Sequence, residues 1–153
     1  TPDHPGTPYL HKDRFSRGKG MFHGIDFRPP AETPDNDYPF WLTTGTIFSQ
    51  YLTGTMTRRC PSLHHENSAA FIQIHPDDAT RLQIYPGEEV KASTRRGGIT
   101  AKAWITERVK PGVVFIPMHF MENAANRLTN AALDSITKTP EYKVCAVRLE
   151  KPA

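Results

Sequence analysis

The chain has 153 residues, enough for one domain with a buried core. Its 19 Lys and Arg against 16 Asp and Glu give a formal charge of +3. That charge suits one small anionic ligand but is too small to indicate a nucleic-acid-binding protein. No stretch approaches the roughly 20 apolar residues of a membrane helix, so we expect no membrane span.

The first segment reads as a connector. The chain starts at Thr1 without an initiator methionine or a signal-peptide pattern, which indicates a fragment of a longer protein. Residues 1–39 are rich in Pro, Gly and charge, and repeated Pro disfavours helices and central strands. We therefore predict an ordered connector from a preceding domain over 1–39 and a folded domain over 40–153. Isolated aromatics indicate that the connector lies against a folded surface: Tyr9, Phe15, Phe22 and Phe27.

From residue 40 the chain alternates short apolar runs with Pro and Gly turns. A short helix is predicted over 76–84, because Pro76 suits a helix start and the acids Asp77 and Asp78 complement the positive helix N-terminus. A hairpin turn is expected at 95–98 and a helical turn or two within 122–133. Strands are expected over 40–45, 69–75, 88–94, 99–106, 113–120 and 142–150. This spacing indicates a mainly β fold, a closed or nearly closed barrel with helical insertions.

Two strands carry explicit packing predictions. In 69–75 we expect Phe71, Ile72 and Ile74 to be the packing residues. In 142–150 we expect Val144 and Ala146 to alternate with charged residues, with Val147 as a further candidate beside them.

The two cysteines, Cys60 and Cys145, show no CxxC spacing and are interpreted as reduced, buried or half-buried thiols. His64, His65 and His75 have no further ligand at a spacing that would complete a metal site, so no metal ligand is predicted.

Several motifs occur in an order that resembles a known family. They are LTTG (42–45), TGTMTRR (53–59), HPDDATRLQI (75–84), PGEEV (86–90), RRGG (95–98), GVVFIP (112–117), ANRLTN (125–130) and TKTPEYKVCAVRLE (137–150). Together with the connector, they resemble the C-terminal domain of the dimethyl-sulfoxide-reductase family of molybdenum and tungsten enzymes. The closing TPEYKVCAVR is most similar to formate dehydrogenases, whereas periplasmic nitrate reductases share the LTTG, TGTMTRR and HPDDA regions.

The resemblance implies a six-stranded double-psi β-barrel that binds one or two molybdopterin guanine dinucleotides. In the family, the metal ligand, the active-site His and Arg and the iron–sulfur cysteines lie in earlier domains. No catalytic residue is therefore expected here. The implied partners are the catalytic domains of the same large subunit and an iron–sulfur electron-transfer subunit, in a cytoplasmic enzyme.

The resemblance also implies the cofactor-binding residues. The stretch 44–53 would wrap the pterin and its phosphate. Relatives carry Arg where this chain has Thr46, which removes a charge, and His where it has Gln50, whose amide still donates a hydrogen bond. The expected cofactor-binding residues of this stretch are Thr44, Gly45, Thr46, Ile47, Gln50, Leu52 and Thr53, and the TGTMTRR motif adds Thr57.

The other expected contacts lie after residue 117. Met118 is polarizable and packs well on a flat heterocycle, and His119 follows it. Asn126 offers a donor and an acceptor to a pterin or guanine edge. Tyr142 supplies a stacking face, and Lys143 supplies a point charge for phosphate.

Other readings of these motifs remain open. Asn123 and Asn130 are interpreted as cap or loop residues. Arg58 and Arg59 suit a pyrophosphate, but a solvated basic turn or a salt bridge to other domains is favoured over a direct ligand contact for either arginine. For function, the alternatives are the same domain of a nitrate reductase, or a double-psi barrel that serves as a protein-interaction module through RRGG and TGTMTRR.

Overall fold

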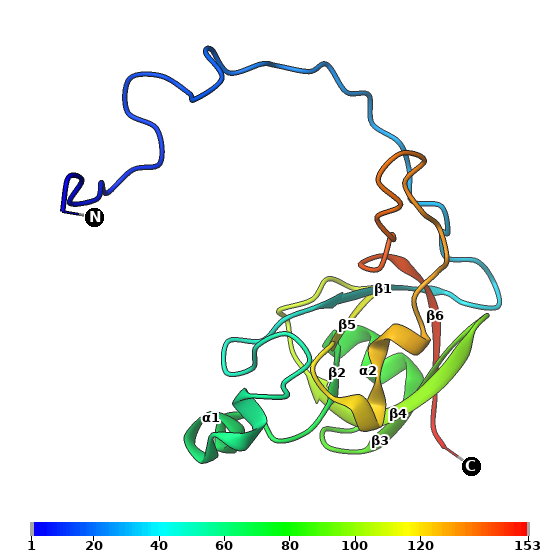
Figure 1. Cartoon of the computed structure of the whole chain (residues 1–153). Helices are drawn as coiled ribbons and strands as arrows, with labels where there is room; N and C mark the ends of the chain where they lie inside the picture. The colour runs from blue at the N-terminus through cyan, green and yellow to red at the C-terminus, as the bar shows by residue number, and fades with distance from the viewer. Residues whose placement is uncertain (1, 153) are drawn as a thin grey trace.

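The computed structural model describes residues 2–152, and its body is a closed barrel with the strand order β1-β5-β2-β4-β3-β6 (Figure 1). The β1–β5 and β2–β4 pairs are parallel and the other pairs are antiparallel. The six-stranded barrel expected from the sequence is thereby confirmed. The strands are β1 (Phe40–Gly45), β2 (Phe71–Ile74), β3 (Glu89–Thr94), β4 (Gly97–Ile105), β5 (Val113–Pro117) and β6 (Cys145–Glu150).

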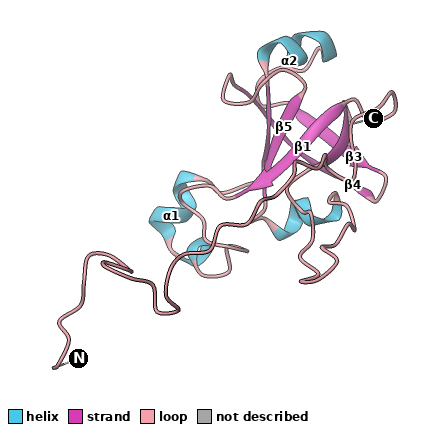
Figure 2. Cartoon of the chain, turned by 90° about the horizontal axis from the view of Figure 1, so that it is seen from above, coloured by secondary structure: helices cyan, strands magenta, loops and turns pink. Residues whose placement is uncertain are grey.

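Short helices lie at opposite ends of the barrel (Figure 2). At one end is α2 (Pro76–Leu82), which begins as predicted: Pro76 opens it and His75 Nδ1 accepts a hydrogen bond from the Asp77 amide at 3.2 Å. At the other end lies α1 (Pro61–Glu66), which the sequence analysis did not predict. Three 3₁₀ turns complete the helical elements: η1 (Thr57–Arg59), η2 (Met121–Asn123) and η3 (Ala125–Arg127).

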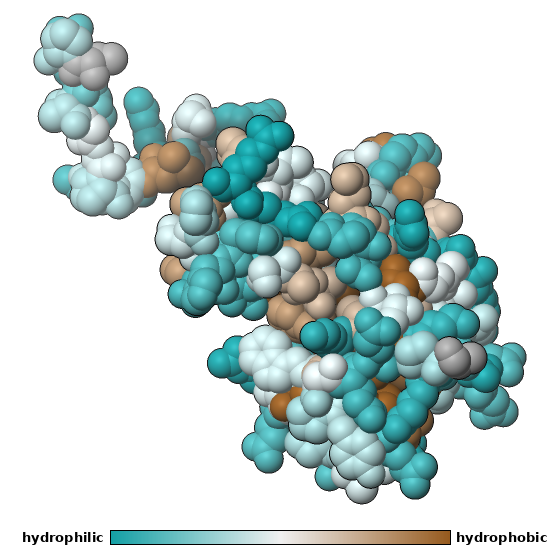
Figure 3. Space-filling view, turned by 90° about the horizontal axis from the view of Figure 1, so that it is seen from below, coloured by the Kyte–Doolittle hydropathy of each residue, from teal (hydrophilic) through white to brown (hydrophobic). Residues whose placement is uncertain are grey.

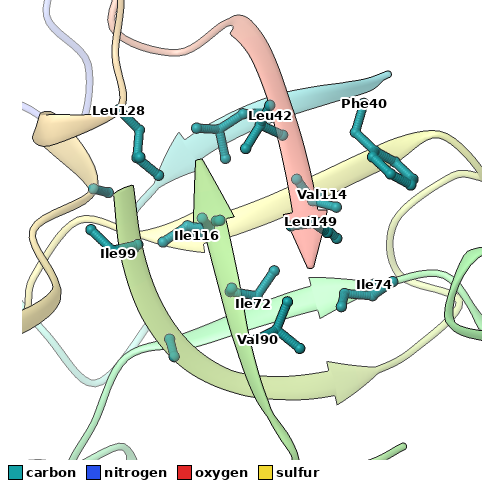
Figure 4. Packing of buried hydrophobic residues seen from close by; sticks show 14 of the residues in the cluster. Phe40, Leu42, Ile72, Ile74, Val90, Ile99, Val114, Ile116, Leu128 and Leu149 are labelled. Atoms are coloured by element: carbon teal, nitrogen blue, oxygen red, sulfur yellow. The ribbon is translucent and has the colours of Figure 1, made fainter. Parts of the chain in front are cut away.

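The barrel interior is filled by alternate residues of the strands (Figure 4). Phe40 and Leu42 of β1 face Val114 and Ile116 of β5 inside the barrel, and all four are 1% exposed or less. Burying one such side chain contributes about 1.5–3 kcal/mol. The period-two pattern therefore fixes which face of each strand points inward.

The packing prediction for β6 is wrong in part. In β6 the core residues are Cys145, Val147 and Leu149, so the expected register of Val144 and Ala146 is shifted by one. Ala146 is still buried, but on the outer face, where its amide donates to Glu32 at 3.2 Å. The connector covers this outer face of β6. Alternation within the strand cannot show that its outer face is also buried.

In β2, Ile72 and Ile74 are fully buried, as predicted. Phe71 packs on the outer wall, with its ring centroid 4.9 Å from that of Trp104 and 6.4 Å from that of Phe115. Both cysteines are free thiols, Cys145 buried and Cys60 half-buried, as expected.

The last part of the connector is clamped to the barrel. The Glu32 carboxylate accepts hydrogen bonds from Arg96 at 2.5 Å and Arg95 at 3.1 Å, both in the β3–β4 turn. Burial raises the pKa of Glu32, but Arg96, the Ala146 amide and Arg95 together outweigh burial and lower it below 4.5. The ion pairs thus tie Glu32 of the connector to the β3–β4 turn, which comprises Arg95 and Arg96.

Residues 2–29 run away from the barrel (Figures 1 and 3). Phe22 and Phe27 are exposed, at 101% and 88%, and Tyr9 and Phe15 are nearly half exposed. The folded surface that we expected beneath these aromatics is therefore not supplied by the barrel. Within the described residues, no helix has the length and apolar character needed to cross a bilayer.

Candidate functional site

Three segments from distant parts of the sequence meet at one end of the barrel. Because β1 and β5 are parallel, both end at the same edge, with Gly45 paired to Pro117 and the Met118 amide donating to Gly45 O at 3.0 Å. The antiparallel β6 starts beside the end of β1, and Thr44 Oγ1 donates to Tyr142 O at 2.7 Å. The topology therefore gathers the residues after β1, after β5 and before β6.

His119 holds the loop after β1 in place. Its ring is fully buried, Nε2 accepts from the Ile47 amide at 2.9 Å, and Nδ1 contacts Leu52 O. The carbonyl at Nδ1 and the N–H at Nε2 assign the proton to Nδ1 of a neutral ring. His119 thus bridges both ends of the stretch 47–52.

Gln50 is a second anchor of this loop and is 4% exposed. Its Oε1 accepts from Thr57 Oγ1 at 2.6 Å, and its Nε2 donates to Asn67 O at 2.9 Å. Thr57 Oγ1 also accepts from the Tyr51 amide at 3.1 Å. The polar groups of Gln50 and Thr57 are therefore engaged in hydrogen bonds within the loop, and these bonds fix its conformation.

A cavity of about 480 Å³ lies between this loop and the segment after β5. Gly54 is buried in its wall at φ +73°, where a Cβ would come within 2.8 Å of Arg58 Cδ and 3.0 Å of His119 O. Only glycine fits there without strain. The cavity is lined by Thr53, Gly54, Thr55, Arg58, Arg59, His64, Met118, His119, Phe120, Met121, Ala124 and Asn126.

An ion pair crosses beside the cavity. Arg58 binds Glu122 through both terminal nitrogens, with Nη1 3.0 Å from Oε2, and its guanidinium lies 5.4 Å from the centre of the Phe120 ring. The hydrogen bond from Arg58 is the main reason that the pKa of Glu122 lies below its ordinary 4.5. Arg59 is exposed and forms no ion pair with any residue between 2 and 152. The wall therefore retains a net positive charge.

The structure divides the expected cofactor-binding residues into groups. Those that line the cavity are Thr53, Met118, His119 and Asn126. Thr46 and Ile47 instead border a smaller hollow of about 350 Å³ on the outer wall, together with Phe71, Trp104 and Phe115. Thr44, Gln50 and Thr57 are engaged in the internal hydrogen bonds of the loop, and Leu52 is 54% exposed at φ +47°.

Tyr142 and Lys143 lie at the surface in a turn before β6, which begins at Cys145 and not at residue 142 as predicted. Lys143 Nζ is 5.9 Å from the centre of the Tyr142 ring. The Thr44–Tyr142 hydrogen bond keeps this turn at the cavity end of the barrel.

The cavity also contains residues that the sequence analysis did not select. Gly54 and His64 are the most informative of them. Gly54 lies between two threonines, and such a glycine could have indicated a close approach of the backbone to a ligand. His64 carried no such signal, because only the fold brings α1 to the cavity wall. Asn123 and Asn130 bind Thr100 O and Val144 O respectively, which confirms their structural role.

The sequence of the barrel matches a known family. The family described as "Molydopterin dinucleotide binding domain" matches residues 40–146. The chain belongs to this family. Residues 40–146 of this molybdopterin dinucleotide binding domain include β1 to β5, the cavity and the Tyr142–Lys143 turn.

Similar sequences come from larger enzymes. The domain is 55% identical over 151 residues to the F420-dependent formate dehydrogenase subunit alpha of Methanocaldococcus jannaschii, covering 97% of this chain and 22% of that protein. It is 49% identical to the F420-dependent formate dehydrogenase 2 subunit alpha of Methanococcus maripaludis, covering 99% of the chain and 23% of that protein. A nitrate reductase of Symbiobacterium thermophilum is 45% identical over 138 residues, which cover 88% of this chain and 18% of that protein. The chain thus spans about a fifth of these relatives' length.

The fold of the domain also occurs in a solved structure. Acetylene hydratase from Pelobacter acetylenicus matches with a TM-score of 0.73 over 83% of this chain and 21% of that protein, at 15% sequence identity. Identity at this level supports the shared fold and carries no functional argument.

The residues of the cavity fit a polar, partly anionic ligand of the kind that the family name describes. Arg58 Nε and His64 Nδ1 are buried side-chain nitrogens that find no hydrogen-bond partner among residues 2–152, and both residues line the cavity. Gly54 lets backbone and ligand come close. Within residues 2–152 no group of three His, Cys, Asp or Glu could hold a metal ion. The domain can therefore contribute donors and shape to a cofactor, and its own side chains form no such ligand cluster.

Proposed function

We propose that this domain binds molybdopterin guanine dinucleotide as the C-terminal domain of a formate dehydrogenase large subunit. The observation that carries the proposal is the cavity between the loops after β1 and β5. It brings four expected residues together with two nitrogens that have no partner in the described part of the chain, inside a family that binds molybdopterin dinucleotides. The relatives at 55% and 49% identity are named as formate dehydrogenase alpha subunits.

The residues of this chain would bind and orient the cofactor. Thr53, Met118 and Asn126 supply a hydroxyl, an apolar contact and an amide to the cavity. His119 and Gln50 hold the loop that presents Thr46 and Ile47. Lys143 supplies a positive charge at the same end of the barrel. When bound, the cofactor and its metal supply the two-electron chemistry on formate, and this chain contributes no catalytic residue.

The test replaces Asn126 and Lys143 by Ala in the full-length protein that carries this chain. We expect a lower amount of bound pterin dinucleotide per polypeptide, measured after acid release by pterin fluorescence. A matched control is Asn36→Ala, an exposed asparagine in the connector. If both site variants retain the cofactor content of the control, the proposed binding site is wrong. Turnover of formate by the isolated 153-residue chain would contradict the division of labour.

The second candidate is the same role in a nitrate reductase, since a relative of that name is 45% identical. The two candidates differ in the reaction of the full-length protein. We expect formate-driven reduction of F420, the acceptor in the names of the two formate dehydrogenase relatives, and no nitrate reduction. Nitrate-dependent oxidation of a reduced dye would favour the second candidate.

The surroundings of the domain are part of the same proposal. Residues 1–39 would connect it to the catalytic domains of the large subunit, and the exposed aromatics of residues 2–29 would pack on those domains. An iron–sulfur subunit would receive the electrons in a cytoplasmic enzyme. Limited proteolysis of the full-length protein tests the connector, because packed aromatics would protect residues 2–29 from cleavage.

A further inference from the structure

The cavity wall contains an unusual pair of unsatisfied groups. Among residues 2–152, three buried side-chain nitrogen or oxygen atoms lack a hydrogen-bond partner: Arg58 Nε, His64 Nδ1 and Ser93 Oγ. Two of the three belong to residues that line the same cavity, although they come from different elements, η1 and α1. Folded proteins rarely leave buried polar atoms unpaired, so two on one wall indicate a partner that the chain does not supply.

Arg58 is held so that its Nε has no hydrogen-bond partner among residues 2–152, while both terminal nitrogens are bound. Its two terminal nitrogens bind the Glu122 carboxylate, and its guanidinium lies 5.4 Å from the centre of the Phe120 ring. Its aliphatic stem runs past Gly54, where any Cβ would come within 2.8 Å of Cδ. The bidentate pair fixes the plane of the guanidinium, and among residues 2–152 Nε is the one nitrogen of this side chain without a hydrogen-bond partner.

Glu122 also sets the charge of the site. It neutralises Arg58, so this part of the wall offers a directed N–H and little net charge. The unpaired Arg59 on the same cavity supplies the excess positive charge. Such a combination suits an oxygen acceptor that is oriented by hydrogen bonds and attracted by one nearby cation.

We propose that Arg58 Nε–H and His64, in the tautomer that carries its proton on Nδ1, form a donor pair for one oxygen acceptor of the bound cofactor, with Glu122 as the positioning residue. This inference rests on the proposed function, because it assigns a part of the same cavity. The acceptor is an oxygen of the pyrophosphate or a carbonyl oxygen of a ring, and both present the same lone pairs to an N–H donor.

The test measures the rate at which the full-length holoprotein loses its pterin dinucleotide in mild urea, followed by fluorescence. We expect Arg58→Gln and Glu122→Gln to accelerate the loss about tenfold or more, since each weakens a hydrogen bond to a charged or polar ligand atom. The matched control is Glu88→Gln, which breaks the surface ion pair with Lys151 (3.3 Å) away from the cavity. Its release rate should equal that of the wild type.

His64 offers a rescue experiment. His64→Phe removes the donor and should also accelerate release, whereas His64→Asn places an amide N–H near the position of Nδ1 and should restore slow release. A purely structural role of His64 would not distinguish the two variants in this way. Thermal unfolding of each variant of the 153-residue chain shows whether the barrel remains folded.

A further experiment separates the two acceptors. Inorganic pyrophosphate is titrated into the 153-residue chain while the backbone amide signals of Gly54 and His64 are followed by NMR. A shift in the wild type that is lost in Arg58→Gln assigns the pyrophosphate. If Arg58→Gln accelerates cofactor release but pyrophosphate shifts neither amide signal of the wild type, the acceptor is a ring carbonyl.

The outcomes separate this inference from the proposed function. A loaded wild type whose Arg58, Glu122 and His64 variants all release the cofactor at the control rate overturns the donor pair but leaves the binding function intact. A wild-type protein that carries no pterin dinucleotide overturns both.

Discussion

Replacing His119 by Phe tests the architecture of the candidate site most directly. Phe has a similar shape and keeps the packing against Phe120, but it can neither accept from the Ile47 amide nor bind Leu52 O. A buried group left without its partner costs about 1–3 kcal/mol. Leu52 is 54% exposed and recovers part of its loss from water, so we expect a total loss of about 2–4 kcal/mol.

The assay is urea denaturation of the 153-residue chain, combined with hydrogen exchange at the Ile47 amide. His119→Phe should lower the urea midpoint and accelerate this exchange, because the loop 47–52 loses its anchor. His65→Phe is the matched control, since His65 is exposed on α1 and its replacement should change stability by less than about 0.5 kcal/mol. Equal midpoints for both variants and unchanged exchange at Ile47 would refute the role of His119 as the loop anchor.

Three further predictions concern the barrel and its thiols. Gly54→Ala should lower the free energy of unfolding, measured in urea, by about 1–3 kcal/mol, because of the left-handed φ and the new contact. Gly87→Ala, at φ +80° with open space around it, should lower the free energy of unfolding by only about 1 kcal/mol. Because the pKa of Glu32 is lowered in the folded state, its stabilisation is present above pH 4.5 and is lost as the pH falls through the folded pKa. Urea midpoints of wild type and Glu32→Gln should therefore differ at pH 6 and converge near pH 3; a constant difference would contradict the assignment. The Cys60 thiol, whose pKa is lowered by hydrogen bonds from a neighbouring serine side chain and backbone amides, should be alkylated by iodoacetamide at pH 8, whereas burial raises the pKa of Cys145 to about 11 and should leave it unmodified in mass spectra of the folded chain.

Much of the barrel could be predicted from local patterns. Strands β1, β3 and β5 and the start of α2 follow from alternation, turn residues and the Pro76 helix start. The face of β6 could not be predicted, because Glu32 lies 114 residues from Ala146 in the sequence and covers its outer side. Apolar residues on both faces of a short strand leave the register undecided until such a long-range cover is known.

Site residues could be predicted where a side chain suited to the ligand also lies in a segment that follows a strand end. Met118 and Asn126 follow a strand end and line the cavity. The inward roles of Gln50 and Thr57 could not be read from the sequence, because hydroxyls and amides suit a ligand and a loop anchor equally. His64 reaches the cavity only through the unpredicted α1. The pairing of Arg58 with Glu122 joins residues 64 positions apart.

The strand order has a consequence for how the site comes into being. Of the pairings in the described barrel, only β3–β4 joins strands that are neighbours in sequence. Every other pairing closes a long loop, whose entropy is lost before the contacts contribute, so the chain should fold slowly from this hairpin outward. Because β1 pairs with strands far along the chain, we expect its closure against β5 and β6, and with it the cavity, to form late. A ligand that needs the complete cavity should therefore slow unfolding of the folded barrel. It should leave the folding rate unchanged, because partly folded states lack the cavity.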